Sequence, residues 1–332
     1  MSKIISATAS WNARKFFFQW EWLLAVIFLL IHLINSLISP WYFNMNTFLS
    51  APMSFLDKAF IVLPMMMVII LGNIDISVAS MVALTSVLMA VIFNAGIPMP
   101  LALVSALFIG TILGGINGLL LVKFRELPAM IVTLATMTIY RGAAYVILED
   151  RAAGGFPPWF SFFSWGHVGP FPFIMIVFAA AAAVFGILLH KTGFGRIVYG
   201  MGSNRTACIY SGVKTGRVLV IVGLLTGLMS AVCAIFLTSR MGSTRPNVAL
   251  GYELDVIAMV VLGGVSTSGG TGRIAGPILA VFIIGFLNYG LGLINVSAQV
   301  LLIILGLLLV LSVLVMNLRT DKRGKKTRMG RV

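Results

Sequence analysis

The stretch HKTGFGRIVYGMGSNRTACIYSGVKTGR, residues 190–217, organises the chain because it lies between two groups of long apolar runs. It is the longest interior segment without a membrane-spanning run, and its cations are Lys191, Arg196, Arg205, Lys214 and Arg217. Residues 204–210 predict a short helix, with Asn204 as its N-cap and Gly212 closing its end in a left-handed conformation. Such a helix has little of its own chain to pack against, so we expect it to dock on a soluble protein.

The composition of the chain identifies it as a membrane protein. Of its 332 residues, 60% are hydrophobic and 10% are charged, and the mean hydropathy is +1.06. Soluble domains carry about 25% charged residues, whereas apolar runs of about 20 residues span a bilayer. The net charge of +14 does not indicate a nucleic-acid partner, because most cations lie in short segments beside apolar runs. The composition therefore predicts an all-α polytopic membrane protein.

The apolar runs predict about ten transmembrane helices. No A-x-A-like cleavage site follows the first run, so we expect a retained helix rather than a signal peptide. The predicted spans are 20–39, 58–72, a run ending at 93, 100–122, 128–148, a run ending at 190, 218–238, 253–263, 277–290 and 298–316.

The positions of lysine and arginine predict the orientation of the chain. With the N-terminus inside, most of the 23 Lys and Arg residues lie inside, Arg141 falls within a span, and the remainder lie outside: Lys58, Arg151, Arg240 and Arg245. We therefore expect both termini to be cytoplasmic. The expected parts are a cytoplasmic N-terminal segment, a transmembrane domain with a cytoplasmic loop at 190–217, and a basic cytoplasmic tail, which cover 1–19, 20–316 and 317–332.

Two glycine-rich polar segments predict broken helices. They are G-N-I-D-I-S at 72–77 and G-G-V-S-T-S-G-G-T-G-R-I-A-G at 263–276. An interrupted helix frees backbone groups and supplies a polar wall within the membrane. The two segments also resemble each other, L-G-N-I-D-I-S against L-G-G-V-S-T-S, which leaves an internal repeat open.

Ionisable residues within or beside the spans have structural and functional interpretations. Asp75 is expected either to cap the third span through the following backbone N–H groups or to line a route for a polar solute. Arg141 fits a pathway, an ion pair or a side chain that extends to the interface. Glu253 and Asp255 could cap the eighth span or meet an external partner. Small residues in the fourth span predict tight helix packing, namely Gly110, Gly114, Gly115 and Gly118.

The patterns of several enzyme classes are absent from the sequence. No G-x-x-x-x-G-K-[ST] phosphate loop occurs, and the three histidines lack metal-ligand spacing. Cys208 and Cys233 are too few to predict a disulfide framework. One aspartate and one arginine supply little material for binding a coupling ion, so a carrier powered by another protein fits better than an ion-driven one.

Four ordered segments resemble the sugar-type permeases of bacterial ABC importers, the ribose, xylose, rhamnose and autoinducer-2 branch. They are G-N-I-D-I-S-V-A-S (72–80), L-P-A-M-I-V-T-L-A-T-M-T-I-Y-R-G (127–142), the loop F-G-R…G-S-N…A…S-G-V (194–213) and G-Y-E-L-D-V-I-A…V-L-G-G-V-S…G-G-T-G (251–272). The resemblance covers nearly the whole chain, about 20–316. Asn73 and Ala79 stand where the family pattern has glycine.

The resemblance implies a dimeric permease core in the bacterial inner membrane, which imports a solute by alternating access. Its partners would be two cytoplasmic ATPase subunits, or one fused pair, and a periplasmic sugar-binding protein. ATP would be used by the partner, and this chain would be a transport subunit without a cofactor, metal or catalytic residue of its own. Residues 237–246 and 20–24 look most like rhamnose-type permeases, with autoinducer-2 permeases the nearest competitors and pentose import a further alternative.

Three groups of residues are expected to carry this function. The translocation pathway would involve Asn73, Asp75, Ser77 and Arg141. Coupling to the ATPase would involve Gly202, Asn204, Arg205, Ala207, Ser211 and Gly212. The binding protein would contact Arg240, Arg245 and Glu253. Outside the family, an ion-coupled sugar carrier and an export or scaffold component remain alternatives.

Overall fold

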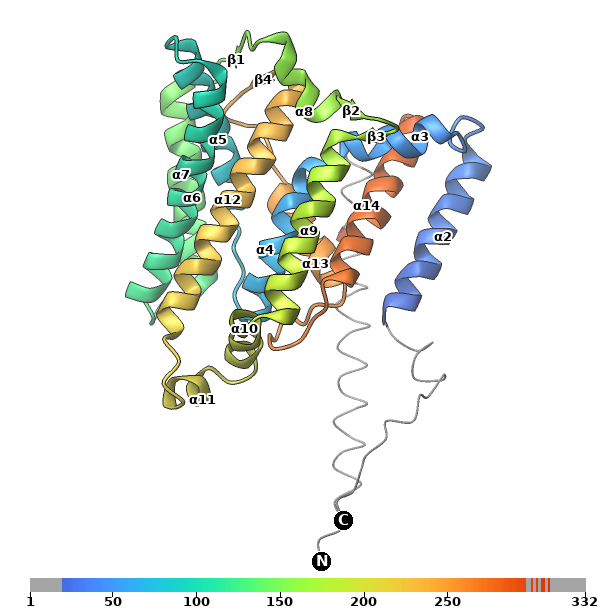
Figure 1. The fold of residues 1–332 in the computed structure, drawn as a ribbon. Coiled ribbons are helices and arrows are strands. Elements are labelled where there is room, and N and C mark those ends of the chain that lie inside the picture. Colours follow the sequence, from blue (N-terminus) through green and yellow to red (C-terminus); the bar gives the residue numbers. More distant parts are fainter. Residues whose placement is uncertain (1–19, 297–299, 301–302, 304–305, 308–309, 311–332) are drawn as a thin grey trace, which may run out of the picture.

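A computed structural model describes residues 20–296 together with residues 300, 303, 306, 307 and 310. The segments 1–19 and 317–332 and most of the predicted span 298–316 lie outside the described residues. Within the described part, long helices form one bundle, with α10 and α11 at one end and the short strands and α8 at the other (Figure 1).

Each of the first nine predicted spans coincides with a helix. These are α2 (Trp20–Ile38), α4 (Leu56–Ile70), α5 (Val78–Asn94), α6 (Met99–Lys123), α7 (Ala129–Leu148), α9 (Phe173–Lys191), α12 (Thr215–Met241), α13 (Tyr252–Leu262) and α14 (Ala275–Leu293). The breaks predicted at 72–77 and 263–276 are confirmed, because α4 ends before the first and α13 before the second.

Length and composition decide which described helices can cross a membrane. Six are long and apolar enough, and they become seven if Thr47–Ser54 and Leu56–Ile70, bent by 63°, count as one span. Helix α5 is apolar but shorter, at 17 residues, and α13 has 11. The all-α polytopic class is confirmed, whereas the number of ten spans stays a prediction.

Short elements complete the described chain. The helices are α3 (Met45–Ser50), η1 (Ala51–Ser54), η2 (Pro158–Ser161), α8 (Phe162–Trp165), α10 (Gly193–Ser203) and α11 (Arg205–Tyr210). The strands have two residues each and form two antiparallel pairs. β1 (Ala153–Gly154) pairs with β4 (Ser243–Thr244), and β2 (His167–Val168) pairs with β3 (Phe171–Pro172).

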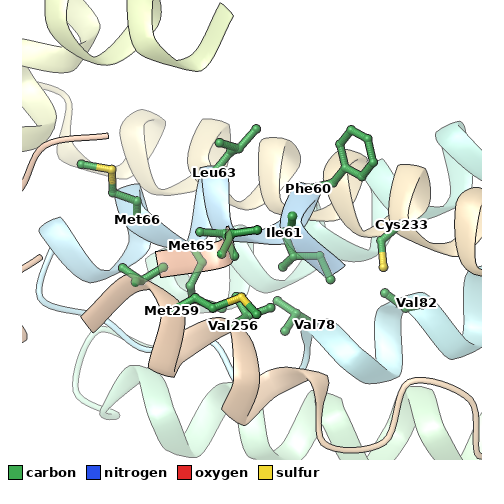
Figure 2. Close-up of a cluster of buried hydrophobic side chains, with 14 of the residues drawn as sticks. Phe60, Ile61, Leu63, Met65, Met66, Val78, Val82, Cys233, Val256 and Met259 are labelled. Atoms are coloured by element: carbon green, nitrogen blue, oxygen red, sulfur yellow. The ribbon is translucent and has the colours of Figure 1, made fainter. Parts of the chain in front are cut away.

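Helix α4 forms the centre of the core. All 15 of its residues are buried, because α9, α12, α13 and α14 surround it. Figure 2 shows α4 side chains, among them Ile61 and Met65, together with Val78 of α5, Cys233 of α12 and Met259 of α13. Flexible methionines fill irregular gaps well, which suits a helix that is enclosed on all sides.

The glycines predicted to pack do so, and they bring α6 and α12 into backbone contact. A Cβ atom added to Gly114 would overlap the carbonyl oxygen of Gly223, and one added to Gly118 would meet the backbone of Val220. Gly227 of α12 approaches Gly110 in the same way. Helices that pack through small residues approach closely enough for extensive van der Waals contact, which is the main attraction between helices in lipid.

Two of the cations counted outside the membrane lie in helices and form ion pairs. Lys58 was already the first residue of a predicted span, whereas Arg240 was expected in the loop after the seventh span. Lys58 is buried in the first turn of α4, because it forms an ion pair with Asp255 of α13. Arg240 lies in the last turn of α12, which continues to Met241 and ends at Gly242 in a left-handed conformation.

Replacing Gly114 with leucine should force α6 away from α12. Overpacking of a core costs about 1–3 kcal/mol of unfolding free energy, and a clash with backbone is not relieved by a change of rotamer. We expect a lower thermal unfolding midpoint for detergent-purified Gly114→Leu. The control is Gly142→Ala in α7, where no atom lies within 4 Å of the added Cβ. An equal fall in both variants would contradict the packing role of Gly114.

Candidate functional site

The break between α4 and α5 holds a buried carboxylate. Segment 71–77 leaves α4 through Gly72, whose φ of 77° is left-handed. Asp75 is 6% exposed, and its Oδ1 accepts hydrogen bonds from the Ser77 backbone N–H at 2.9 Å and from the Ser77 hydroxyl at 2.6 Å. Ser77 immediately precedes α5, so this is the helix-start geometry that the sequence allowed for Asp75.

Asn117 of α6 extends this group into a network. Its Nδ2 donates to the Ser77 hydroxyl at 2.7 Å and lies 3.4 Å from Asp75 Oδ2. Its Oδ1 accepts a hydrogen bond from the Tyr140 hydroxyl of α7 at 3.1 Å. Buried polar groups need such partners, because a lone one costs about 1–3 kcal/mol. The network therefore ties the break to both neighbouring helices.

Thr133 of α7 contacts the backbone of the break itself. Its hydroxyl lies 3.3 Å from the Ile74 carbonyl oxygen and 3.4 Å from the Ile76 backbone nitrogen. These bonds satisfy groups that the interrupted helix leaves without intrahelical partners.

Asn117, Thr133 and Tyr140 were missing from the sequence prediction. A signal for two of them was present, since Thr133, Thr136 and Tyr140 recur at helical spacing and all three are buried. Asn117 stands between Gly114 and Gly118, which the sequence indicated only as packing residues.

A small cavity adjoins the network. Its lining includes Asn73, Asp75, Asn117, Thr133 and Thr226, and its volume is about 20 Å³. A volume of about 10–15 Å³ is needed for one water molecule. Polar side chains form part of its wall, but the cavity is far too small for a monosaccharide, so the break is closed to such a solute in this conformation.

Arg141 lies apart from the break. Its Nη1 donates to the carbonyl oxygens of Pro246 at 2.6 Å and Val248 at 2.8 Å, in the loop before α13. It is eight residues beyond Thr133 on α7, a rise of about 12 Å. The structure thus brings Asn73, Asp75 and Ser77 together and does not bring Arg141 to them.

A second polar cluster ties together the N-terminal ends of α4 and α13 and the C-terminal end of α12. Asp57 is 1% exposed, and its Oδ2 accepts hydrogen bonds from Arg240 Nη2 at 2.8 Å and from the Tyr252 hydroxyl at 3.1 Å. Lys58 and Asp255 form an ion pair beside it. Of the three residues expected to contact a binding protein, Arg240 belongs to this cluster, Arg245 is exposed and Glu253 is half-buried.

The predicted short helix in the loop 190–217 is confirmed. Helix α11 begins after Asn204, whose Oδ1 accepts a hydrogen bond from the Ala207 backbone N–H at 2.9 Å. Gly212 has a φ of 79° and follows its last turn. No residue of α11 is buried, and Tyr210 is 88% exposed. Arg205, Ala207 and Ser211 lie on this exposed segment.

Helix α10, which the sequence did not predict, joins α11 to both breaks. A Cβ at Gly202 would overlap the Ile70 carbonyl oxygen and approach the Gly270 backbone nitrogen. The Gly270 N–H itself donates to the Ile70 carbonyl at 2.8 Å. The end of α10 therefore touches the end of α4 and the loop 263–274 through backbone atoms. We call this contact the Gly202 joint.

Tyr199 holds α10 against the same loop. Its hydroxyl donates to the Gly272 carbonyl oxygen at 2.6 Å. Partial burial raises the pKa of Tyr199 to about 12, so its hydroxyl stays protonated and can donate at neutral pH. Together with the Gly202 joint, this bond makes α10 and the second break one packed unit.

The architecture is that of a membrane transport protein. It combines an apolar bundle that contains two broken helices with a polar site at one break and an exposed helix joined to both breaks. The family described as "Branched-chain amino acid transport system / permease component" matches residues 50–313, and the chain belongs to this family.

Relatives with assigned names extend this result. The chain is 39% identical over 290 residues to the ribose import permease protein RbsC of Bacillus subtilis (strain 168), covering 87% of this chain and 89% of that protein. It is 33% identical to the RbsC of Haemophilus influenzae, covering 95% and 98%. It is 34% identical to the autoinducer 2 import system permease protein LsrD of Escherichia coli (strain K12), covering 89% and 91%. No solved structure gives a significant match.

Membership of this family settles the class of the protein. It is a multi-pass protein of the bacterial inner membrane and a permease of the ABC sugar importer family. It is a transport subunit rather than an enzyme, and ATP hydrolysis lies on separate subunits. The family in general works with ATPase subunits and a periplasmic binding protein.

Replacing Asn117 with alanine should destabilise the protein, because Ser77, Asp75 and Tyr140 would each lose a buried partner. Leaving a buried polar group unsatisfied costs about 1–3 kcal/mol. The thermal unfolding midpoint in detergent should fall. The control on the same helix is Ser105→Ala, since within the described residues the Ser105 hydroxyl bonds only the Ala102 carbonyl of its own helix. If Asn117→Ala were as stable as Ser105→Ala, the network would not hold α5, α6 and α7 together.

Proposed function

We propose that this chain is the permease subunit of an ATP-driven importer for a monosaccharide or a related small polar solute. The observation that carries the proposal is the Gly202 joint, which connects the exposed α10–α11 segment to both broken helices. A partner can drive a conformational change only through contacts that differ between two states. An ATPase that moved α11 would act directly on the ends of the helices around the polar site.

The docking surface for the ATPase would be the exposed part of the coupling segment 202–212, in which Gly202 itself packs against the broken helices. Only Cys208 of α11 packs against the core and no residue of the helix is fully buried, so its exposed side chains can meet another protein. Asn204 and Gly212 would keep the helix rigid at its two ends, and Arg205 would supply a positive charge near its start. Ala207 and Ser211 lie on the same short segment and would be covered by the partner.

The solute would pass beside Asn73, Asp75 and Ser77. Amide, carboxylate and hydroxyl groups are suited to hydrogen bonding with sugar hydroxyls. Because the cavity here has room for about one water molecule, passage requires the walls of the break to separate. Asp75 would keep its bonds to Ser77 while Asn117 or Thr133 moved away.

The wider assembly follows the same proposal. The chain would have ten spans with both termini and α11 on the cytoplasmic side, and it would form a dimer with itself or a related permease. A periplasmic binding protein would meet the opposite end, where Arg245 is exposed and Arg240 and Glu253 are half-buried. This chain would bind no cofactor, and ATP would be used by its partner.

The names of the relatives indicate a class of solute. The relatives named above are permeases for ribose and autoinducer 2. Their names support a small sugar or sugar-like solute, with ribose or autoinducer 2 as candidates. The preference for rhamnose rests on the resemblance of residues 237–246 and 20–24 alone.

Uptake by proteoliposomes tests the proposal. The permease would be reconstituted with its ATPase, ATP inside the lumen, and each candidate solute offered outside with its binding protein. We expect uptake of one solute that requires both ATP and the binding protein. Uptake without the ATPase that responds to an imposed proton or sodium gradient would instead identify an ion-coupled carrier.

Reversing the charge of Arg205 should weaken ATPase docking without disturbing the fold. Arg205 is exposed and is the first residue of α11. We expect Arg205→Glu to lower the amount of ATPase that co-purifies with the permease. Arg151→Glu, whose side chain is 82% exposed on a different loop, is the matched control. Equal co-purification of both variants would show that α11 is not the docking surface.

Replacing Gly202 with valine should leave docking largely intact and impair coupling. The new side chain would push α10 off the Ile70 carbonyl and Gly270, while α11 keeps its exposed residues. We expect the ATPase to co-purify but ATP-dependent uptake to fall at least tenfold. Gly193→Ala is the control on the same helix, because its Cβ would meet only the flexible Arg196 side chain, at 3.7 Å. Normal uptake by Gly202→Val would rule out transmission through this joint.

A further inference from the structure

A large cavity lies where α6 ends and α12 begins, beside α11. Its volume is about 750 Å³, within the range of about 300–1,000 Å³ that is common for ligand sites. The proposed transport route does not use it, because none of the residues that line the polar break belongs to it.

The cavity has an apolar wall made by membrane-spanning helices. Val122 lies in the last turn of α6, and Val220 and Ile221 lie in the second turn of α12. Both helices are long and apolar enough to cross the membrane. Their ends mark the level where hydrocarbon gives way to headgroups, so a lipid can enter from the bilayer.

The mouth of the cavity is strongly positive. Arg125, Lys214 and Arg217 all belong to the lining, which contains no acidic residue. In the described part of the chain, none of these three cations has a carboxylate within ion-pair distance. Arg125 donates through Nε to the Val122 carbonyl at 3.1 Å, which sets the guanidinium at the end of α6 and leaves its other nitrogens for an anion.

We propose that this cavity binds one anionic phospholipid. The phosphate would contact Arg125, Lys214 and Arg217, and an acyl chain would lie along Val122, Val220 and Ile221. Basic pockets between membrane helices recognise anionic headgroups in this way, and arginine suits phosphate because it can donate two parallel hydrogen bonds.

The apolar wall favours a lipid over a soluble anion or the docked ATPase. A free anion would gain no binding energy from the three aliphatic side chains of the spans, because they offer it neither charge nor hydrogen-bond donors. Tyr210, the residue of α11 that is 88% exposed, does not line the cavity, so a protein that covers α11 need not fill it. Ile209 and Val213 do line it, and a bound lipid would therefore brace α11 against α12.

Native mass spectrometry of the full-length protein tests this site. Phosphatidylglycerol and phosphatidylcholine with identical acyl chains would be titrated onto detergent-purified protein. We expect preferential retention of phosphatidylglycerol, and a fall in its affinity of roughly fivefold for each of Arg125→Gln and Arg217→Gln, the value expected for one cation at a lipid surface. Arg151→Gln removes an exposed charge elsewhere and should leave the affinity unchanged.

Three results would overturn the proposal. Equal retention of the two lipids would show that the cations do not select a headgroup. Competition by glycerophosphoglycerol, which lacks acyl chains, at the same concentration as the lipid would identify a site for soluble anions. Loss of ATPase co-purification in Arg217→Gln with unchanged lipid affinity would assign the cavity to the partner protein. Because Arg125 and Arg217 are both exposed, the two variants are independent checks should one fail to fold.

Discussion

The backbones of α6 and α12 touch along glycines, and the polar site depends on that approach. Asn117 stands on α6 between Gly114 and Gly118, the residues through which α6 packs against the backbone of α12. From that position it reaches Ser77 and Asp75 on one side and Tyr140 on the other. In lipid, where burial of apolar surface does not drive helices together, close packing of this kind holds the polar network in place.

The second constraint is that broken helices must not leave their backbone ends without partners inside a membrane. The two breaks meet this requirement partly by pairing with each other, since the Ile70 carbonyl at the end of α4 accepts the Gly270 N–H of the other break. Tyr199 of α10 supplies a further donor to that loop. The same bonds that satisfy the interrupted backbone thus join the two breaks to the segment that carries α11.

Sequence reasoning recovered the parts of the fold that local pattern controls. The apolar runs predicted nine helices that the structure describes, and Asn204 and Gly212 predicted the ends of α11. Helix α10 was missed because its glycines read as a loop, whereas tertiary contacts with the breaks hold it helical. The ion pairs of Lys58 and Arg240 were not predicted, because an ion pair across distant segments leaves no local signal. Asn117 was missed because its hydrogen bonds likewise cross distant segments of the chain. On α7, the spacing of Thr133, Thr136 and Tyr140 did indicate a polar face.

The Gly202 joint is made by main-chain atoms, while the exposed part of α11 is made of side chains. The choice of soluble partner and the transmission of motion therefore depend on different positions in the chain. Surface substitutions on α11 can change which soluble protein binds there and leave the Gly202 joint untouched. Such substitutions cannot change how motion reaches the broken helices. Nearly any side chain at Gly202 would separate α10 from the end of α4 and from the loop 263–274. A permease built in this way can accept a different ATPase while its own conformational change stays the same.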